Sequence, residues 1–390
     1  MLVGLVGGPN KGKSTLFNAL THGSAAVADY PFTTIDPNKG VAFLDFPCAC
    51  QGLGVACFPR YGKCVNGIRS VPVNVIDVAG LVPGAHEGKG KGNEFLSDLS
   101  QASALVCVAD ASGLTDEFGN PAPAGYDVSR DVSFVEEELD RWFGKVVARN
   151  SQRFSRAKGL GEIEQILSGV GVRESHLQEA IKQSGVAPEW AKWRERDFLL
   201  LAAALRKLSK PIVVAANKMD MPRAQENLAK LQQILQGYSV IAVAADLELA
   251  LGKASEKGLV EYDGKGLKIV ADLSTQPPAM KAALERLKAT FEKLGTTGVQ
   301  TLLHKIFFEK LDCIAVFPVQ DERKYADHLG RVLPDAILLP KGSTAVDLAG
   351  AIHSDLAKGF LYAVDARTKM RMGRDEPLAD GSVVKIVSAN

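Results

Sequence analysis

Short apolar runs separated by polar stretches recur along most of the chain, a pattern typical of an α/β protein whose strands are buried on both faces. Runs that predict strands lie at residues 2–6, 40–46, 73–76, 105–109, 211–216 and 240–243. From residue 126 to about 208 the strand pattern is missing, and the sequence predicts helices. We therefore expect a doubly wound sheet with a helical region inserted between the strands at 105–109 and 211–216.

The pattern changes after helical stretches at about 279–311. Strands are predicted at 313–319, 336–339, 360–364 and 383–387, with a helix that begins at a cap on Ser343 or Thr344 and continues to about residue 356. This order predicts a small mixed α+β unit. We expect a first domain at 1–125 and 209–311 with a cysteine-rich insertion at 47–70, a helical insertion at 126–208, and a C-terminal domain at 312–390.

Composition places the chain among soluble globular proteins of two or three domains. Its 390 residues include 46 lysines and arginines against 45 acidic residues, so no global basic field indicates nucleic acid. No apolar run reaches the roughly 18 residues that a membrane-spanning helix needs. The N-terminus enters the first strand without a signal-peptide pattern, which predicts a cytoplasmic protein with no membrane partner.

Residues 7–14 directly follow the first apolar run and precede a predicted helix. They read Gly7-Gly8-Pro9-Asn10-Lys11-Gly12-Lys13-Ser14, which matches the phosphate-binding pattern G-x-x-x-x-G-K-S at every fixed position. In such a loop, converging backbone N–H groups and the positive end of the helix dipole hold phosphate oxygens. Lys13 would reach the β- and γ-phosphates, and the Ser14 hydroxyl would ligate Mg²⁺. The residues expected to contact nucleotide are Gly7, Pro9, Asn10, Lys11, Gly12, Lys13, Ser14 and Thr15.

Two later stretches supply further parts of a nucleotide switch. Thr34, with Thr33 as the alternative, lies in a polar, proline-broken loop and could bind Mg²⁺ while the γ-phosphate is present, although a bland polar loop is the other interpretation. Asp77 ends an apolar strand and would bind Mg²⁺ through water, while Gly80 lets a backbone N–H approach the γ-phosphate. Leu81 stands where many regulatory GTPases carry a glutamine, so the attacking water must be positioned otherwise.

The identity of the base is indicated by Asn217-Lys218-Met219-Asp220, an N-K-x-D motif that follows the strand at 211–216. Aspartate can accept hydrogen bonds from guanine N1–H and from the exocyclic amine, a donor pair that adenine lacks. Further along, Ala244-Ala245 would place a backbone N–H, that of Ala245, against guanine O6. Because these elements follow apolar strands in the expected order, the sequence predicts a GTPase with GTP and GDP as ligands.

The chain resembles the Obg-like translation-factor GTPases, specifically the YchF-related branch found in archaea and eukaryotes. The segments that carry the resemblance are GGPNKGKSTLFNAL, DYPFTTIDPN and VIDVAGLVPGAHEGKGKGNEFLSDL. The resemblance extends over nearly the whole chain and implies a P-loop domain, a helical insertion, a C-terminal TGS domain of β-grasp fold, and a role at the ribosome. Some members with a degenerate guanine motif prefer ATP, whereas Asn217, Lys218 and Asp220 are intact here and favour GTP.

Two residues are candidates to assist hydrolysis in place of Leu81. Asn10 resembles the asparagine that in some GTPases helps hold K⁺ against the phosphates, where the ion could take the place of an arginine finger. The alternative is a turn residue chosen because it tolerates left-handed geometry. His86 could approach the γ-phosphate as an orienting group, or it could be a solvent-exposed loop histidine. We expect slow unaided turnover, with Lys13, Asn10, Thr34, Gly80 and His86 as the candidate catalytic residues.

Four of the six cysteines crowd into seventeen residues as Cys48-x-Cys50-x6-Cys57-x6-Cys64. Four thiolates can close a tetrahedral Zn²⁺ site, and a loop without a core benefits from such a staple. The spacing is not that of paired C-x2-C units. A redox-active pair, an iron–sulfur cluster and four unligated thiols remain as alternatives.

Two basic strips suggest a ribosome or ribosomal RNA as partner. Arg141, Lys145, Arg149 and Arg153 recur at four-residue spacing in the helical insertion, and Arg367-x-Lys369-x-Arg371-x-x-Arg374 would alternate along one side of a strand or hairpin. A solvated helix face and a protein contact are the other interpretations. We expect a Mg²⁺-dependent GTPase acting as a translation or stress switch, with an ATP-preferring Obg-like ATPase or a nucleotide-responsive binding protein of little turnover as the alternatives.

Overall fold

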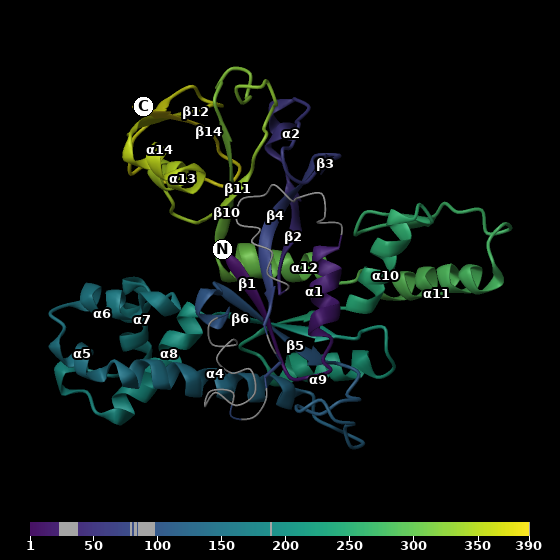
Figure 1. Cartoon of the computed structure of the whole chain (residues 1–390), viewed down its shortest axis with the longest axis horizontal. Helices are drawn as coiled ribbons and strands as arrows, with labels where there is room; N and C mark the ends of the chain where they lie inside the picture. Colours follow the sequence, from purple (N-terminus) through teal and green to yellow (C-terminus); the bar gives the residue numbers. More distant parts are fainter. Residues whose placement is uncertain (23–37, 79, 82–83, 85–97, 188, 390) are drawn as a thin grey trace. The chain divides into compact units, whose positions relative to one another are not determined.

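The computed structural model describes the chain except for residues 23–37, 79, 82–83, 85–97, 188 and 390 (Figure 1). It divides into two compact units, each described by itself. Of the described residues, the N-terminal unit comprises those within 1–22, 38–40 and 74–302, and the C-terminal unit comprises those within 41–73 and 303–389.

A seven-stranded sheet has strand order β2-β4-β1-β5-β6-β7, and β3 pairs with β4 beside this path. Its strands are β1 (Leu2–Val6), β2 (Lys39–Pro47), β3 (Cys64–Val65), β4 (Ile68–Asp77), β5 (Ala104–Asp110), β6 (Ile212–Asn217) and β7 (Ser239–Ala242). The N-terminal unit holds β1, β5, β6 and β7, whereas β3 and most of β2 and β4 belong to the range 41–73 of the C-terminal unit. β1 is parallel to both β4 and β5, and β6 is parallel to β5 and β7. Every residue of β5 and β6 is buried, as expected for parallel strands covered on both faces. The predicted doubly wound α/β fold is confirmed.

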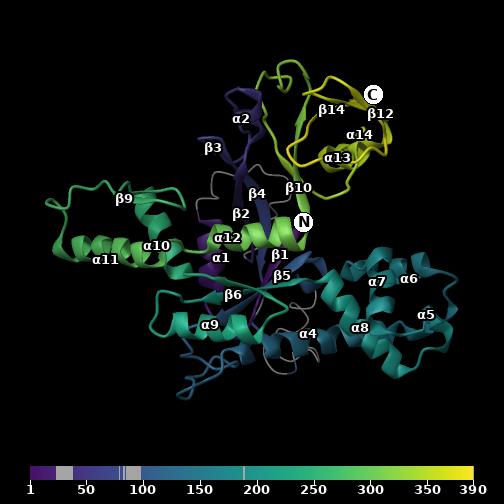
Figure 2. The same cartoon turned by 180° about the vertical axis from the view of Figure 1, so that it is seen from behind.

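The helical region between β5 and β6 is also confirmed. It contains α4 (Ser129–Arg149), α5 (Ser151–Arg156), α6 (Leu160–Leu167), α7 (Glu174–Ser184) and α8 (Glu195–Ser209). α4 runs beside α8 and also contacts β5 (Figures 1 and 2). One continuous apolar core includes Leu105 of the sheet together with Phe143 and Leu205 of the insertion. The insertion therefore shares its core with the sheet.

The remaining helices of the N-terminal unit flank or follow the parallel strands. They are α1 (Lys13–Thr21), α9 (Ala224–Ile234), α10 (Ala245–Glu256), α11 (Pro278–Leu294) and α12 (Val299–His304), the last of which ends in the other unit. α1 packs against α10. A small antiparallel hairpin of β8 (Val260–Tyr262) and β9 (Leu267–Ile269) lies between α10 and α11 and was not predicted.

The C-terminal unit is built on a five-stranded sheet of order β11-β10-β14-β12-β13. Its elements are a π-helix (Lys305–Lys310), β10 (Cys313–Val319), β11 (Ile337–Pro340), α13 (Ala345–Ile352), α14 (Ser354–Lys358), β12 (Phe360–Asp365), β13 (Arg371–Met372) and β14 (Val383–Ser388). Thr344 caps α13 because its hydroxyl accepts from the Asp347 N–H while the Asp347 carboxylate accepts from the Thr344 N–H. This settles the cap between Ser343 and Thr344, and the predicted small α+β unit is present.

The cysteine-rich segment groups with the C-terminal unit, whereas the sequence placed it within the first domain. The ring of Phe46 lies 6.0 Å from that of Phe308 and 6.2 Å from that of Phe317. The Phe58 N–H donates to the Val332 carbonyl oxygen. Contacts of this kind join residues far apart in the sequence, so local patterns could not reveal them.

In the structure, neither of the two predicted basic strips forms a continuous face. α4 ends at Arg149, so Arg153 belongs to another helix, and Arg141 pairs with the carboxylates of Glu137 and Glu138. In the second strip, Lys369 has a φ of +63° in the turn after β12 and its amine lies over the Tyr325 ring. The turn breaks the alternation that a strand would have kept. In the described part of the chain, no helix is long and apolar enough to cross a membrane.

Candidate functional site

The predicted phosphate loop connects β1 to α1, and its backbone adopts a conformation that depends on its glycines. Gly12 lies at φ +87°, and a Cβ there would stand 2.4 Å from the Asn217 Nδ2. A Cβ on Gly8 would stand 2.3 Å from the Glu117 carbonyl oxygen. Both glycines therefore permit close approaches that a side chain would block. Pro9 is packed against Gly119, and Thr15 is half-buried in the first turn of α1.

Lys13 is held over this loop. Its Nζ donates to the Gly8 carbonyl oxygen at 2.8 Å, and its side chain is buried. Burial lowers the pKa of Lys13, although the nearby Asp77 carboxylate acts in the opposite direction. The amine is thus positioned within the loop whose amides are expected to bind phosphate.

Ser14 and Asp77, the two predicted magnesium ligands within the described residues, meet directly. The Ser14 hydroxyl donates to Asp77 Oδ2 at 2.7 Å. Asp77 Oδ1 is buried and lacks a hydrogen-bond partner among the described residues. An orphaned carboxylate oxygen beside a serine hydroxyl matches the oxygen ligands that Mg²⁺ prefers. The third predicted ligand, Thr34, and its alternative Thr33 lie outside the described residues.

The residues that follow Asp77 are only partly described. A Cβ on Gly80 would stand 3.4 Å from Lys13 Nζ, so Gly80 lies beside the phosphate loop, and its predicted approach to the γ-phosphate stays a prediction. Leu81 is 1% exposed, and its N–H donates to the Gly7 carbonyl oxygen at 3.2 Å. A buried apolar side chain cannot hold a water molecule in place. His86 lies outside the described residues, so its predicted role stays a prediction.

Asn217 joins the guanine motif to two other loops. Its Nδ2 donates to the Lys11 carbonyl oxygen at 3.1 Å, and its Oδ1 accepts from the Ala245 N–H at 3.1 Å. The Ala245 N–H, which the sequence assigned to guanine O6, is therefore already used by Asn217. The Ala244 N–H likewise donates to the Thr297 carbonyl oxygen.

Lys218 is held by a carboxylate that the sequence analysis missed. Its Nζ donates to the Asn10 carbonyl oxygen at 2.9 Å and to Asp110 Oδ2 at 2.8 Å. Burial alone would raise the pKa of Asp110, but hydrogen bonds from Lys218, Ser112 and Thr115 hold it below its ordinary value. A signal was available, because Asp110 ends an apolar strand whose parallel neighbour ends at Asn217 in register.

Asp220, the predicted base-reading carboxylate, has an exposed side chain next to this network. Desolvation raises its pKa, and the neighbouring Asp246 carboxylate adds to that effect. Asp220 makes no ion pair among the described residues. Its oxygens are therefore accessible acceptors for a ligand with paired N–H donors.

Lys11 and Asn10 use their side chains to fix the loop. Lys11 Nζ lies 2.8 Å from Asp131 Oδ1, and both side chains are fully buried. Any contact of Lys11 with nucleotide would therefore come from its backbone. Asn10 adopts the left-handed conformation at φ +59°, and its Nδ2 donates to the Gly119 carbonyl oxygen at 2.9 Å. This geometry agrees with the turn-residue interpretation, and the K⁺ role stays a prediction.

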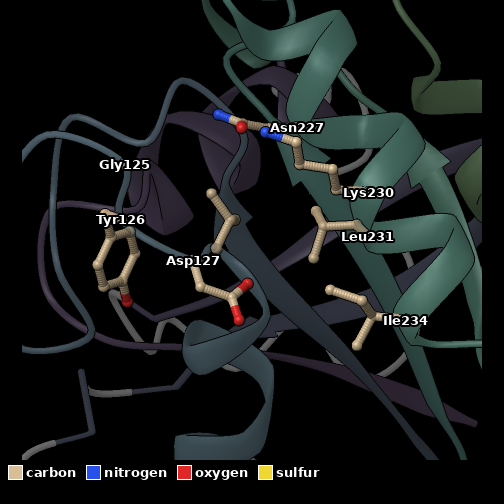
Figure 3. A pocket seen from close by; sticks show the side chains of 8 residues that line it. Gly125, Tyr126, Asp127, Asn227, Lys230, Leu231 and Ile234 are labelled. Carbon is tan, nitrogen blue, oxygen red and sulfur yellow. The ribbon is translucent and has the colours of Figure 1, made fainter.

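A separate pocket lies between the segment that leads into α4 and the helix α9 (Figure 3). Its charged groups are engaged elsewhere: Lys230 pairs with Glu226, and the Asp127 carboxylate accepts from the Ser129 N–H. We assign this pocket no role. The four clustered cysteines form a second candidate site and are treated below.

Comparisons with known proteins agree with this geometry. Residues 2–124 match a family model described as 50S ribosome-binding GTPase, residues 215–321 match the Obg-like GTPase YGR210-like, G4 motif-containing domain, and residues 329–388 match the TGS domain. An uncharacterized GTP-binding protein of Methanocaldococcus jannaschii is 47% identical, and the match covers 100% of this chain and 99% of the relative. The chain belongs to the Obg-like, YchF-related family of P-loop GTP-binding proteins.

Three further matches place this Obg-like protein among its relatives. A solved GTP-binding protein from Pyrococcus horikoshii is 34% identical, with a TM-score of 0.78 and complete coverage of both chains. The YchF GTPase of Schizosaccharomyces pombe, at 19% identity, a TM-score of 0.58 and coverage of 99% and 97%, shares the fold. A Bacillus subtilis relative named ribosome-binding ATPase YchF is 28% identical over 93% of this chain and 87% of its own.

Proposed function

We propose that this Obg-like protein binds GTP with Mg²⁺ and hydrolyses it slowly to GDP and phosphate. The observation that carries the proposal is the double hydrogen bond of Asn217, which ties the guanine motif to the phosphate loop and leaves Asp220 exposed beside it. The motif is therefore intact both in sequence and in position. Some relatives are named ATPases, so the choice of base is the part that most needs a test.

Guanine and adenine differ at the edge that Asp220 would read. A carboxylate accepts from both the N1–H and the exocyclic amine of guanine, whereas adenine presents an unprotonated N1 there. Hydrogen bonds to a charged acceptor are worth about 1.5–3 kcal/mol, enough for a ten- to hundredfold preference. This role requires the ionised carboxylate, while desolvation raises the pKa of Asp220.

The chain's own groups have distinct tasks in the proposed reaction. Lys13 and the loop amides would stabilise charge on the transferred phosphoryl group. Ser14, Asp77 and Thr34 would hold Mg²⁺, which when bound neutralises phosphate charge. The buried side chain of Leu81 leaves water positioning to other groups, with K⁺ near Asn10 and the His86 side chain as the candidates. This is the reason to expect slow unaided turnover.

The decisive experiment replaces Asp220 by asparagine and measures the affinities of GTP, ATP and xanthosine triphosphate. An amide cannot accept both guanine donors, but its N–H₂ can donate to the C2 carbonyl of xanthine. We expect Asp220→Asn to lose at least tenfold in GTP affinity and to gain for xanthosine triphosphate. Asp246→Asn is the matched control, because it makes the same change at the exposed neighbouring carboxylate.

Equal binding of ATP and GTP by the wild type, with neither changed in Asp220→Asn, would contradict the guanine assignment. Phosphate release from GTP should be measured in the same preparations in Na⁺ and in K⁺ buffer. Stimulation by K⁺ that Asn10→Ala removes would support the role of Asn10. Tight GTP binding without any turnover would instead favour a nucleotide-responsive binding protein.

We further propose that the nucleotide state controls association with the ribosome in the cytoplasm. The supports are the family model described as 50S ribosome-binding GTPase, the Bacillus subtilis relative named for ribosome binding, and the exposed arginines Arg149 and Arg153. The helical insertion and the TGS domain are the proposed contact regions with ribosomal RNA.

A further inference from the structure

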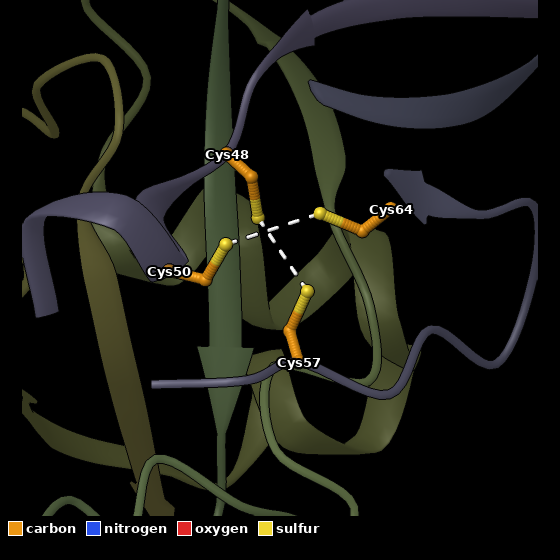
Figure 4. Close-up of side chains that lie close together, drawn as sticks. All are labelled: Cys48, Cys50, Cys57 and Cys64. Carbon is orange, nitrogen blue, oxygen red and sulfur yellow. Dashed lines mark hydrogen bonds between the residues drawn. The ribbon is translucent and has the colours of Figure 1, made fainter. Parts of the chain in front are cut away.

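The four clustered cysteines converge on one point in the C-terminal unit (Figure 4). Cys48 follows β2, Cys50 lies in α2 (Ala49–Leu53), Cys57 lies in the loop after it, and Cys64 begins β3. Their Sγ atoms all lie within 4.8 Å of one another. Four segments thus bring four thiols together, although their spacing in the sequence matches no paired C-x2-C unit.

The distances discriminate between the possible uses of these thiols. The Sγ atoms of Cys48 and Cys57 are 3.9 Å apart, as are those of Cys50 and Cys64. A disulfide would bring two sulfurs to about 2.05 Å. Zn–S bonds of about 2.3 Å in a tetrahedron place the sulfurs about 3.8 Å apart. An iron–sulfur cluster, whose irons and sulfides lie between the thiolates, needs a wider arrangement. The observed spacing is that of a single tetrahedral ion.

The local backbone is shaped to hold this arrangement. Asn66 and Gly67, at φ +51° and +75°, form a two-residue turn that pairs Cys64 with Arg69 across β3 and β4. The Cys48 N–H donates to the Gly67 carbonyl oxygen at 2.8 Å, which ties the turn to the start of α2. The thiols therefore approach one another on a hydrogen-bonded frame.

A buried cation lies against the cluster. Arg69 is 1% exposed, and its Nη1 lies 3.9 Å from Cys57 Sγ. Its other contacts are the carbonyl oxygens of Leu333 and Pro334, and among the described residues the Asp335 carboxylate acts on it electrostatically without forming an ion pair. A buried guanidinium is unfavourable unless nearby negative charge compensates it. Four thiolates around a divalent ion carry net negative charge and would add to the compensation from Asp335.

We propose that Cys48, Cys50, Cys57 and Cys64 bind one Zn²⁺ ion as a closed, structural four-thiolate site. Cys48 and Cys50 are buried and Cys57 and Cys64 are half-buried, so all four ligand positions are filled by protein and none is left for a substrate. Through Arg69, the site also fixes the segment around Leu333 and Pro334. Its function is to staple the cysteine-rich segment to the rest of the C-terminal unit.

The test is the metal content of the full-length chain, purified without added metal or chelator and measured by inductively coupled plasma mass spectrometry. We expect one zinc per chain in the wild type and in Cys313→Ser, a cysteine outside the cluster. The double variant Cys57→Ser/Cys64→Ser should lose it. Replacement of the metal by Co²⁺ should give the absorption spectrum of tetrahedral sulfur coordination in the wild type and in Cys313→Ser.

A second measurement keeps the test decisive if the double variant fails to fold. Titration of the native wild type with a mercurial reagent should release zinc as the cluster thiols react, and a zinc indicator dye records the release. Wild-type protein that contains no zinc, contains iron in its place, or shows a disulfide within the cluster by mass spectrometry overturns the proposal. Zinc retained in full by a folded double variant overturns it as well.

Discussion

Lys210 is a fully buried amine that the proposed reaction does not use. Its Nζ donates to the carbonyl oxygens of Ser100 at 3.0 Å and Ala102 at 2.5 Å, and the residue is 1% exposed. Burial lowers its pKa from 10.5 to about 8, because removal from water disfavours the ammonium form. These hydrogen bonds hold the segment that leads into β5. At neutral pH, however, the burial of the ammonium group lowers the free energy of unfolding.

The pH dependence of stability follows from that shift. Between pH 8 and 10.5 the unfolded chain keeps the Lys210 proton while the folded chain has released it, so the free energy of unfolding rises with pH. Over this interval we expect the free energy of unfolding of the wild type to rise by at most about 3 kcal/mol relative to that of Lys210→Met. Urea unfolding at a series of pH values measures the difference.

The control is Lys207→Met, which removes an exposed lysine from the same stretch of chain. Subtracting the free energy of unfolding of the variant from that of the wild type at each pH cancels the contributions of the other groups that titrate in this range. A flat difference for Lys210→Met would show that this amine keeps its ordinary pKa.

Residue types alone predicted part of the candidate site. The glycine pattern predicted the phosphate loop. Ser14 follows β1 and Asp77 ends the neighbouring strand β4, and the two side chains meet as expected from these positions. Asp110 and Asp131 were not predicted, because each acts through a partner more than one hundred positions away. The register of β5 and β6 brings Asp110 near Lys218, and the packing of α4 brings Asp131 to Lys11. A single motif encodes neither arrangement.

At the scale of elements, α4 and α8 are joined by a buried arginine. Arg206 is 2% exposed on α8, and its guanidinium donates to Glu136 Oε1 and Asp140 Oδ1 on α4, both at 2.6 Å. The two carboxylates lie one helical turn apart, so one planar guanidinium reaches both. The contact fixes the helical insertion at the point where the chain returns to β6.

We expect Arg206→Ala to destabilise the helical insertion by about 3 kcal/mol, because it removes a buried cation from two paired carboxylates. Hydrogen exchange of α4 and α8 should accelerate, while GTP affinity changes little because the phosphate loop is not touched. The control Lys192→Ala breaks an exposed pair with Glu189 in the same region and should change stability by less than about 1 kcal/mol. Equal exchange in both variants would contradict this view.

Elements were predicted best where burial is complete. The wholly apolar runs of β5 and β6 appear almost unchanged in the structure, and Thr344 caps α13 as its sequence suggested. β4 is longer than predicted, since its first residues hold the hairpin with β3. The Asn66-Gly67 pair is typical of such a hairpin. The surrounding cysteines, however, favoured the interpretation of this segment as a loop without strands.

For the whole molecule, the near balance of charge means that the proposed RNA contacts would have to be local. With a net charge of +1, any ribosome binding depends on patches such as Arg149 and Arg153. We expect more protein to sediment with ribosomes in a non-hydrolysable GTP analogue than in GDP. Replacement of both arginines by alanine should lower the sedimented fraction several-fold and reduce its salt dependence.

The matched control removes the same charge from α11 by Lys281→Ala/Lys293→Ala, two exposed lysines outside the helical insertion. An equal loss in both double variants would indicate general charge attraction. Sedimentation that does not depend on the bound nucleotide would contradict the proposal that the nucleotide state controls association with the ribosome. Neither result would alter the guanine assignment, which rests on Asp220.

The organisation of the whole chain was predictable only in part. Order and composition revealed the helical insertion and the C-terminal α+β unit, because each has its own periodic pattern. The sequence could not reveal that residues 41–73 belong with that unit. This grouping depends on contacts such as Phe46 with Phe317 and Phe58 with Val332, which bridge more than 250 positions.

The buried pair of Lys11 and Asp131 has a consequence for how such proteins can be recombined. Position 11 is a variable place in the phosphate-loop pattern, yet its ammonium group is neutralised by the helix that opens the insertion. A chimera whose insertion lacks a carboxylate in the place of Asp131 would leave the Lys11 amine stranded in its interior. Engineers who exchange the insertion should therefore keep this pair or replace both of its members.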